Sequence, residues 1–205
     1  MKKILCYGDS NTFGYNPSDT SRYDEKTGWT ALLQADLGSG YEIIEEGVCD
    51  RTGFVHNPKG FLLSAREHFP QMLSKKDNVD LIILAVGTND LQFQYNITFS
   101  DIENGLKNLI QAAQKKVKQI ILIPPVVLNE KVLEGYFSFQ FDNMGIEKSK
   151  QAGEIYNKLA KLYNCRIFDI NKFVKPSDID GLHYDSISHK IIADKLSDYI
   201  KLLSL

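Results

Sequence analysis

The sequence is short of cysteine, and neither sign of charge dominates it. Its 205 residues include three cysteines, an odd and widely spaced set that offers neither a disulfide framework nor a C-x-x-C metal site: Cys6, Cys49 and Cys165. The 24 basic and 26 acidic residues leave a net charge of −2, without the basic stripe that phosphate backbones require. The four histidines show no metal-ligand spacing. We therefore expect reduced thiols, no metal, no cofactor and no nucleic-acid partner.

Long hydrophobic runs are absent as well. No run approaches the length of about 18 apolar residues that a membrane-spanning helix requires. The apolar run after Met1-Lys2-Lys3 is short and lacks a small-residue cleavage site, so it does not match a secretory signal. We expect a cytoplasmic protein without a membrane span. Repeats, low-complexity tracts and linkers are also missing, which predicts a single domain over 1–205.

Short apolar runs alternate with segments of helical periodicity. The expected strands lie at 4–7, 41–45, 80–86, 119–123 and 166–170, and the main expected helices at 28–37, 100–116, 148–163 and 188–203. Ser100 and Glu103 match a capping box for the second of these helices. The composition of 54–69 is irregular, and we expect His56 and His68 at the surface. The alternation predicts the α/β class: a three-layer α/β/α sandwich around a flavodoxin-like, five-stranded parallel sheet of order 2-1-3-4-5.

Three of these strands end in residues that suit a ligand site. Ser10 follows the first strand, Gly47 the second and Asn89 the third. The carboxyl ends of parallel strands meet at one edge of the sheet, where ligands bind in open α/β folds. Ser10 can serve simply as a helix N-cap, or it can be a reactive hydroxyl flanked by free backbone N–H groups.

The segment before the last helix contains Asp180-x-x-His183. An aspartate and a histidine three residues apart on a turn can face the same way, although the pair alone is weak support. In the predicted topology this turn reaches the same edge as Ser10. His183 can then take the proton of Ser10, while Asp180 holds its tautomer. The backbone N–H groups of Ser10 and Gly47 and the Asn89 amide would stabilise an oxyanion.

These segments together resemble the four blocks of the SGNH hydrolases, the GDSL esterase/lipase superfamily. The matching blocks are Gly8-Asp9-Ser10-Asn11, the segment around Gly47, Gly87-Thr88-Asn89-Asp90 and Asp180-x-x-His183. The resemblance implies that Ser10, Asp180 and His183 form a catalytic triad and that Ser10, Gly47 and Asn89 form the oxyanion hole. Asn11 stands where the family name has leucine.

Further segments are similar to the arylesterase and acyltransferase branch of that superfamily: Gly28-Trp29, Glu45-Glu46-Gly47, Arg51-Thr52 and Pro124-Pro125. Members of this branch act on short acyl esters, and some assemble as oligomers. We therefore predict a serine esterase that hydrolyses short-chain aryl or alkyl esters through an acyl-enzyme intermediate, with acyl transfer as a second outcome.

Other functions fit the same residues. A carbohydrate O-acetyl esterase would use the same five side chains and backbone groups, and so would a lysophospholipase or a thioesterase. A non-catalytic flavodoxin-like module could instead hold a phosphate at the helix start of Ser10. The segment 126–144 is rich in large apolar residues without a clear period, which predicts a wall over the site or a contact in a homo-oligomer.

Overall fold

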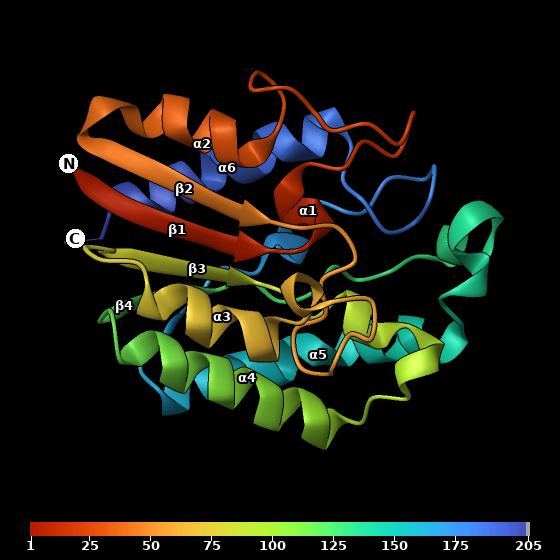
Figure 1. The fold of residues 1–205 in the computed structure, drawn as a ribbon. Coiled ribbons are helices and arrows are strands. Elements are labelled where there is room, and N and C mark those ends of the chain that lie inside the picture. Colours follow the sequence, from red (N-terminus) through yellow and green to blue (C-terminus); the bar gives the residue numbers. More distant parts are fainter. Residues whose placement is uncertain (204–205) are drawn as a thin grey trace.

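A computed structural model describes residues 1–203 and shows a three-layer sandwich (Figure 1). Five parallel strands form the central sheet in the order β2-β1-β3-β4-β5, which confirms the predicted class and strand order. The strands are β1 Lys2–Gly8, β2 Tyr41–Gly47, β3 Leu81–Ala85, β4 Gln119–Leu122 and β5 Arg166–Ile167. The helices are α1 Ser10–Phe13, α2 Trp29–Leu37, α3 Ala65–Ser74, α4 Phe99–Gln114, α5 Asn143–Leu162 and α6 Ser186–Lys201.

Helices cover both faces of the sheet. The pair α2 and α6 packs on one face, and α3, α4 and α5 pack on the other (Figure 1). The interior strands β1 and β3 therefore have no solvent-facing side, and their residues 4–7 and 81–84 are completely buried. This explains their continuous apolar runs, which are typical of parallel strands covered on both faces. Among residues 1–203, no helix is long and apolar enough to cross a membrane.

Glycines end β1 and β2 because the short helix α1 lies directly against them. Gly8 pairs with Gly47 in the β1–β2 register. A Cβ atom on Gly47 would lie 2.3 Å from the backbone nitrogen of Phe13, and one on Gly8 would lie 1.9 Å from Oγ1 of Thr12. These contacts are shorter than any tolerated by real Cβ atoms. The two glycines thus let the chain turn sharply out of the sheet at its carboxyl edge.

The sequence-based prediction missed α3. This helix lies within and beyond the stretch expected to be irregular, and it contains Pro70, which weakens a helical pattern. Its buried face, which includes Phe69 and Leu73, packs into the core and compensates for the proline. His68 belongs to that buried face, so its expected surface position is wrong. Its Nδ1 lies 3.0 Å from the hydroxyl oxygen of Tyr7, and burial lowers the pKa of His68.

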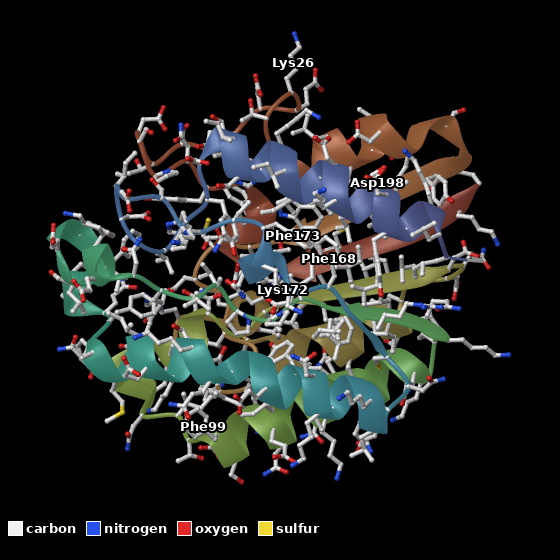
Figure 2. All side chains as sticks on the ribbon, turned by 180° about the vertical axis from the view of Figure 1, so that it is seen from behind. Lys26, Phe99, Phe168, Lys172, Phe173 and Asp198 are labelled. Atoms are coloured by element: carbon white, nitrogen blue, oxygen red, sulfur yellow. The ribbon has the colours of Figure 1, made fainter. Side chains whose placement is uncertain are left out.

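Two helix and strand ends also differ from the prediction. The capping box of α4 is formed by Thr98 and Asp101 rather than by Ser100 and Glu103: the Thr98 hydroxyl accepts the Asp101 N–H at 3.2 Å, and the Asp101 carboxylate accepts the Thr98 N–H at 2.9 Å. β5 ends after Ile167 because Asp169 caps a following 3₁₀ turn. Figure 2 shows Phe168 and Phe173 beside that turn, between α5 and α6; their ring centroids are 5.6 Å apart.

Candidate active site

Ser10 is the first residue of α1, directly after β1. Asp9 caps this four-residue helix, and its Oδ1 accepts the Asn11 N–H at 3.0 Å. The Ser10 side chain is therefore not the helix cap. The helix ends at Gly14, whose φ of 82° is left-handed. Burial raises the pKa of Asp9, while the Asn11 N–H opposes that shift.

Ser10, His183 and Asp180 form a continuous hydrogen-bonded chain. The Ser10 Oγ lies 2.9 Å from Nε2 of His183, and Nδ1 of His183 lies 2.7 Å from Oδ2 of Asp180. Oδ1 of Asp180 accepts the backbone N–H groups of Leu182 and His183, both at 2.9 Å. All three side chains are buried, with 7%, 2% and 8% of their respective residue surfaces exposed. The structure thus brings together residues that stand 173 positions apart in the sequence.

A pocket of about 400 Å³ opens next to Ser10 and His183. Its aromatic and aliphatic lining residues are Tyr15, Tyr136, Phe137 and Leu182, and its other lining residues include Thr20, Cys49, Asp50, Lys59, Asn89 and Gln140. The Tyr15 ring centroid is 4.1 Å from that of His183, and the Phe137 centroid is 5.3 Å away. Aromatic rings therefore cover the imidazole and shield it from water.

The segment 126–144 divides between two environments. Val126, Leu128, Val132 and Phe141 are buried in the core. Tyr136 and Phe137 belong to the 3₁₀ turn Gly135–Phe139 and line the pocket, so this part of the segment is the wall that the sequence predicted as one of two alternatives.

Asn89 reaches the pocket from the 3₁₀ turn Asn89–Leu91, which follows β3. The next residue, Asp90, is fully buried and accepts the backbone N–H groups of Gly53, Phe54 and Val55 at 2.5, 2.7 and 3.0 Å. Burial raises the pKa of Asp90 to about 6, and the three N–H donors oppose this shift. Asp90 thus anchors the loop after β2 to the end of β3.

The same loop is fixed from its other side by Arg51, whose side chain is fully buried. Its guanidinium donates to the carbonyl oxygens of Gly8 at 2.9 Å, Leu62 at 3.0 Å and Glu46, and it lies over the Tyr7 ring at 4.2 Å. The backbone carbonyl of Arg51 in turn accepts the Asn89 side-chain amide at 3.0 Å. No sequence pattern indicates this role of Arg51, because its partners are backbone atoms that only the fold brings together.

Gly47 does not line the pocket. It lies at the end of β2 under the backbone of α1, where its missing side chain permits close packing. The predicted contribution of Gly47 to an oxyanion hole stays a prediction. Asp50, in the loop that follows Gly47, does line the pocket. Its backbone is left-handed, with a φ of +63°. Aspartate is one of the non-glycine residues that adopt the left-handed region most often, but most aspartates do not, so the residue type alone did not single out Asp50.

The other histidines lie outside the pocket. His189 is completely buried at the start of α6, and its Nδ1 accepts the backbone N–H of Trp29 at 3.1 Å. Burial lowers the pKa of His189 to about 4, so it stays neutral and acts as a packing and capping residue. Within residues 1–203, no three His, Cys, Asp or Glu side chains are grouped so that they could hold a metal ion.

A three-layer α/β sandwich with a buried Ser–His–Asp chain at the carboxyl edge of its sheet has the arrangement of a serine hydrolase. A family model described as the GDSL-like Lipase/Acylhydrolase family matches residues 6–190. The chain belongs to this family, which places it among the hydrolases and confirms the resemblance of its four sequence blocks.

Known relatives agree with this assignment. An acetylxylan esterase of Xylanibacter ruminicola is 26% identical over 223 aligned residues, which cover 97% of this chain. The chain spans 43% of the length of that relative. Among solved structures, the native M. smegmatis aryl esterase is 26% identical with a TM-score of 0.91, and the alignment covers 98% of this chain and 99% of that one. A carbohydrate acetylesterase from Sinorhizobium meliloti is 28% identical, with the same TM-score and the same coverage.

Proposed function

We propose that the chain is a serine esterase that acts on short-chain acyl esters through an acyl-enzyme intermediate. The observation that carries this proposal is the 2.9 Å contact between Ser10 Oγ and His183 Nε2. His183 takes the hydroxyl proton as Ser10 attacks the ester carbonyl, and it then donates that proton to the leaving alcohol. Water, activated by the same imidazole, hydrolyses the acyl-serine in the second half of the reaction. Asp180 stabilises the imidazolium formed in each half.

The oxyanion of each tetrahedral intermediate needs hydrogen-bond donors that are already in place. The candidates for these donors are the Ser10 backbone N–H, the Asp50 backbone N–H and the Asn89 side-chain amide. Ser10, Asp50 and Asn89 all line the pocket. Within the described residues, no hydrogen bond uses the backbone N–H of Ser10 or of Asp50. Asp50 therefore takes the place in this proposal that the sequence gave to Gly47.

Short acyl groups fit the pocket best. The aromatic rings of Tyr15 and Phe137 lie close to His183 and restrict the space beside the nucleophile. We expect the enzyme to hydrolyse p-nitrophenyl acetate with a higher kcat/KM than the butyrate, and the octanoate more slowly than either. Rapid mixing with p-nitrophenyl acetate should give a burst of about one p-nitrophenolate per chain if deacylation is slow. Preference for the octanoate would favour a lysophospholipase or thioesterase instead.

Carbohydrate O-acetyl esters are a second candidate substrate class. The residues that line the pocket include Asp50, Lys59 and Gln140, whose groups suit the hydroxyls of a sugar, and Tyr136, which offers an aromatic ring. Acetylated xylose or xylo-oligosaccharides should then release acetate with a kcat/KM at least equal to that of p-nitrophenyl acetate. Hydrolysis of the aryl ester without measurable acetate release from the sugars would restrict the proposal to aryl and alkyl esters.

Exposed apolar side chains between 136 and 144 support the prediction of a homo-oligomer. Tyr136, Phe139 and Met144 are 71%, 58% and 60% exposed, and they lie within one stretch of nine residues. Apolar groups gathered in this way often mark a protein contact. Light scattering after size exclusion at micromolar concentration should give at least twice the mass of the 23.3 kDa chain. A monomeric mass would contradict the prediction.

A further inference from the structure

Gln92 has no role in the mechanism described so far, yet it is buried beside the proposed oxyanion donors with only 1% of its surface exposed. Its Nε2 lies 3.2 Å from Oδ1 of Asn89 and 3.2 Å from Oδ1 of Asp50. Its Oε1 accepts the side-chain amide of Gln94 at 2.7 Å. Both hydrogens of the Gln92 amide nitrogen are thus directed to acceptors on two different pocket residues.

The first of these contacts determines which way the Asn89 amide faces. Because Gln92 presents an N–H group, the Asn89 atom next to it must be the carbonyl oxygen, and the Asn89 nitrogen must lie on the opposite side. One N–H of that nitrogen donates to the Arg51 carbonyl oxygen at 3.0 Å. The other N–H is left for the pocket, where the oxyanion would form.

The second contact holds Asp50, whose backbone N–H is another proposed donor. Oδ1 of Asp50 accepts from Gln92, and Oδ2 pairs with Nζ of Lys59 at 2.5 Å. The ammonium balances a carboxylate that would otherwise stand beside a developing negative charge and raise its energy. Gln92 therefore links Asn89 to the Asp50–Lys59 ion pair in one hydrogen-bonded network.

We propose that Gln92 is a positioning residue of this esterase: it fixes the orientation of the Asn89 amide and the conformation of Asp50, so that both present N–H donors to the oxyanion. The inference rests on the proposed function and adds a residue that does not touch the substrate. Gln92 would therefore affect the energy of the tetrahedral transition state rather than the binding of the ester in its ground state.

Gln92→Met tests this role because methionine fills a similar volume but donates no hydrogen bond. Loss of an oxyanion donor typically costs about 10²–10³ in rate, so loss of its orientation should lower kcat for p-nitrophenyl acetate by about 10–100-fold. KM should change by less than about threefold, since ground-state contacts are kept. Gln111→Met is the matched control: Gln111 is an exposed glutamine of α4 outside the pocket lining, so its kcat should stay within about twofold of wild type.

Two further variants separate positioning from space filling. Gln92→Lys keeps a donor that can reach both acceptors and should recover most of the lost kcat. Gln92→Glu has the right shape but offers only acceptors, so it should be as slow as the methionine variant or slower. If Gln92 only filled space, the glutamate variant would be faster than the lysine variant or the two would be equal.

The decisive measurement combines Gln92→Met with Asn89→Ala. Once the Asn89 amide is gone, Gln92 can act only through Asp50. Gln92→Met should therefore lower kcat by a much smaller factor in the Asn89→Ala background than in the wild-type background. An equal loss of kcat in both backgrounds would overturn the proposal, and so would a normal kcat in Gln92→Met. If the wild-type protein hydrolysed no ester faster than the Ser10→Ala variant does, the proposed function itself would be refuted. If the wild-type protein were active and the Gln92→Met variant had the same kcat, only the proposed role of Gln92 would be refuted.

Discussion

Ser10→Ala should lower kcat for p-nitrophenyl acetate by about 10⁴–10⁶-fold, as expected when the nucleophile of a serine hydrolase is removed. The alanine variant keeps the oxyanion donors and the pocket, but it has no atom that can form the acyl-enzyme. Its fold should persist because the Ser10 hydroxyl bonds only to His183 among the described residues. The measurement is steady-state hydrolysis beside a thermal melt of both proteins.

Ser197→Ala provides the matched control for this substitution. Ser197 is also a buried serine, but it lies in α6 and its hydroxyl has no hydrogen-bond partner within residues 1–203. This variant should keep the wild-type kcat and a similar melting temperature. Undiminished hydrolysis by a folded Ser10→Ala protein would refute the serine mechanism.

Asp180→Asn should cost about 10⁴-fold in kcat, the size of effect seen when a triad carboxylate becomes an amide. The asparagine carbonyl oxygen can still accept the N–H groups of Leu182 and His183, so the turn should survive. Its NH₂ group, however, would face Nδ1 of His183, where the carboxylate now accepts at 2.7 Å. The imidazole would then carry its proton on Nε2 and could not accept the proton of Ser10.

The control for Asp180→Asn is Asp185→Asn in the same loop. Asp185 caps α6, and its Oδ1 accepts the Ser188 N–H at 2.7 Å. Asparagine caps helices about as well as aspartate, so activity and stability should change little. A loss below about tenfold for Asp180→Asn would mean that the tautomer of His183 is set by some other group, contrary to the arrangement proposed here.

The sequence was informative wherever local pattern and topology pointed the same way. Residues 80–86 could only be a buried strand, and a glycine or polar group followed each of the first three strands. A parallel sheet alone predicts that Ser10, Asn89 and the Asp180–His183 pair lie close together at its carboxyl edge. This prediction requires no distance between them to be known. The hydrogen bonds of 2.9 and 2.7 Å agree with that placement.

The features that sequence reasoning missed depend on contacts distant in the chain. Pro70 argued against a helix that core packing nevertheless stabilises. Gly47 looked like a backbone donor, but its lack of a side chain is explained by the close approach of α1. Asp50 adopts a φ of +63°, which its residue type alone does not predict. Gln92 stands three residues after Asn89 in a turn, and only the folded loop shows that its amide faces two pocket residues.

The 173-residue separation of Ser10 and His183 also has a consequence during synthesis. Ser10 is synthesised before four of the five strands, whereas the turn that carries Asp180 and His183 follows β5. A nascent chain therefore carries the Ser10 hydroxyl without the imidazole that would activate it until His183 has been synthesised. Reactivity of Ser10 toward an acylating probe should thus report that the whole sheet has assembled and that the last turn has docked onto it.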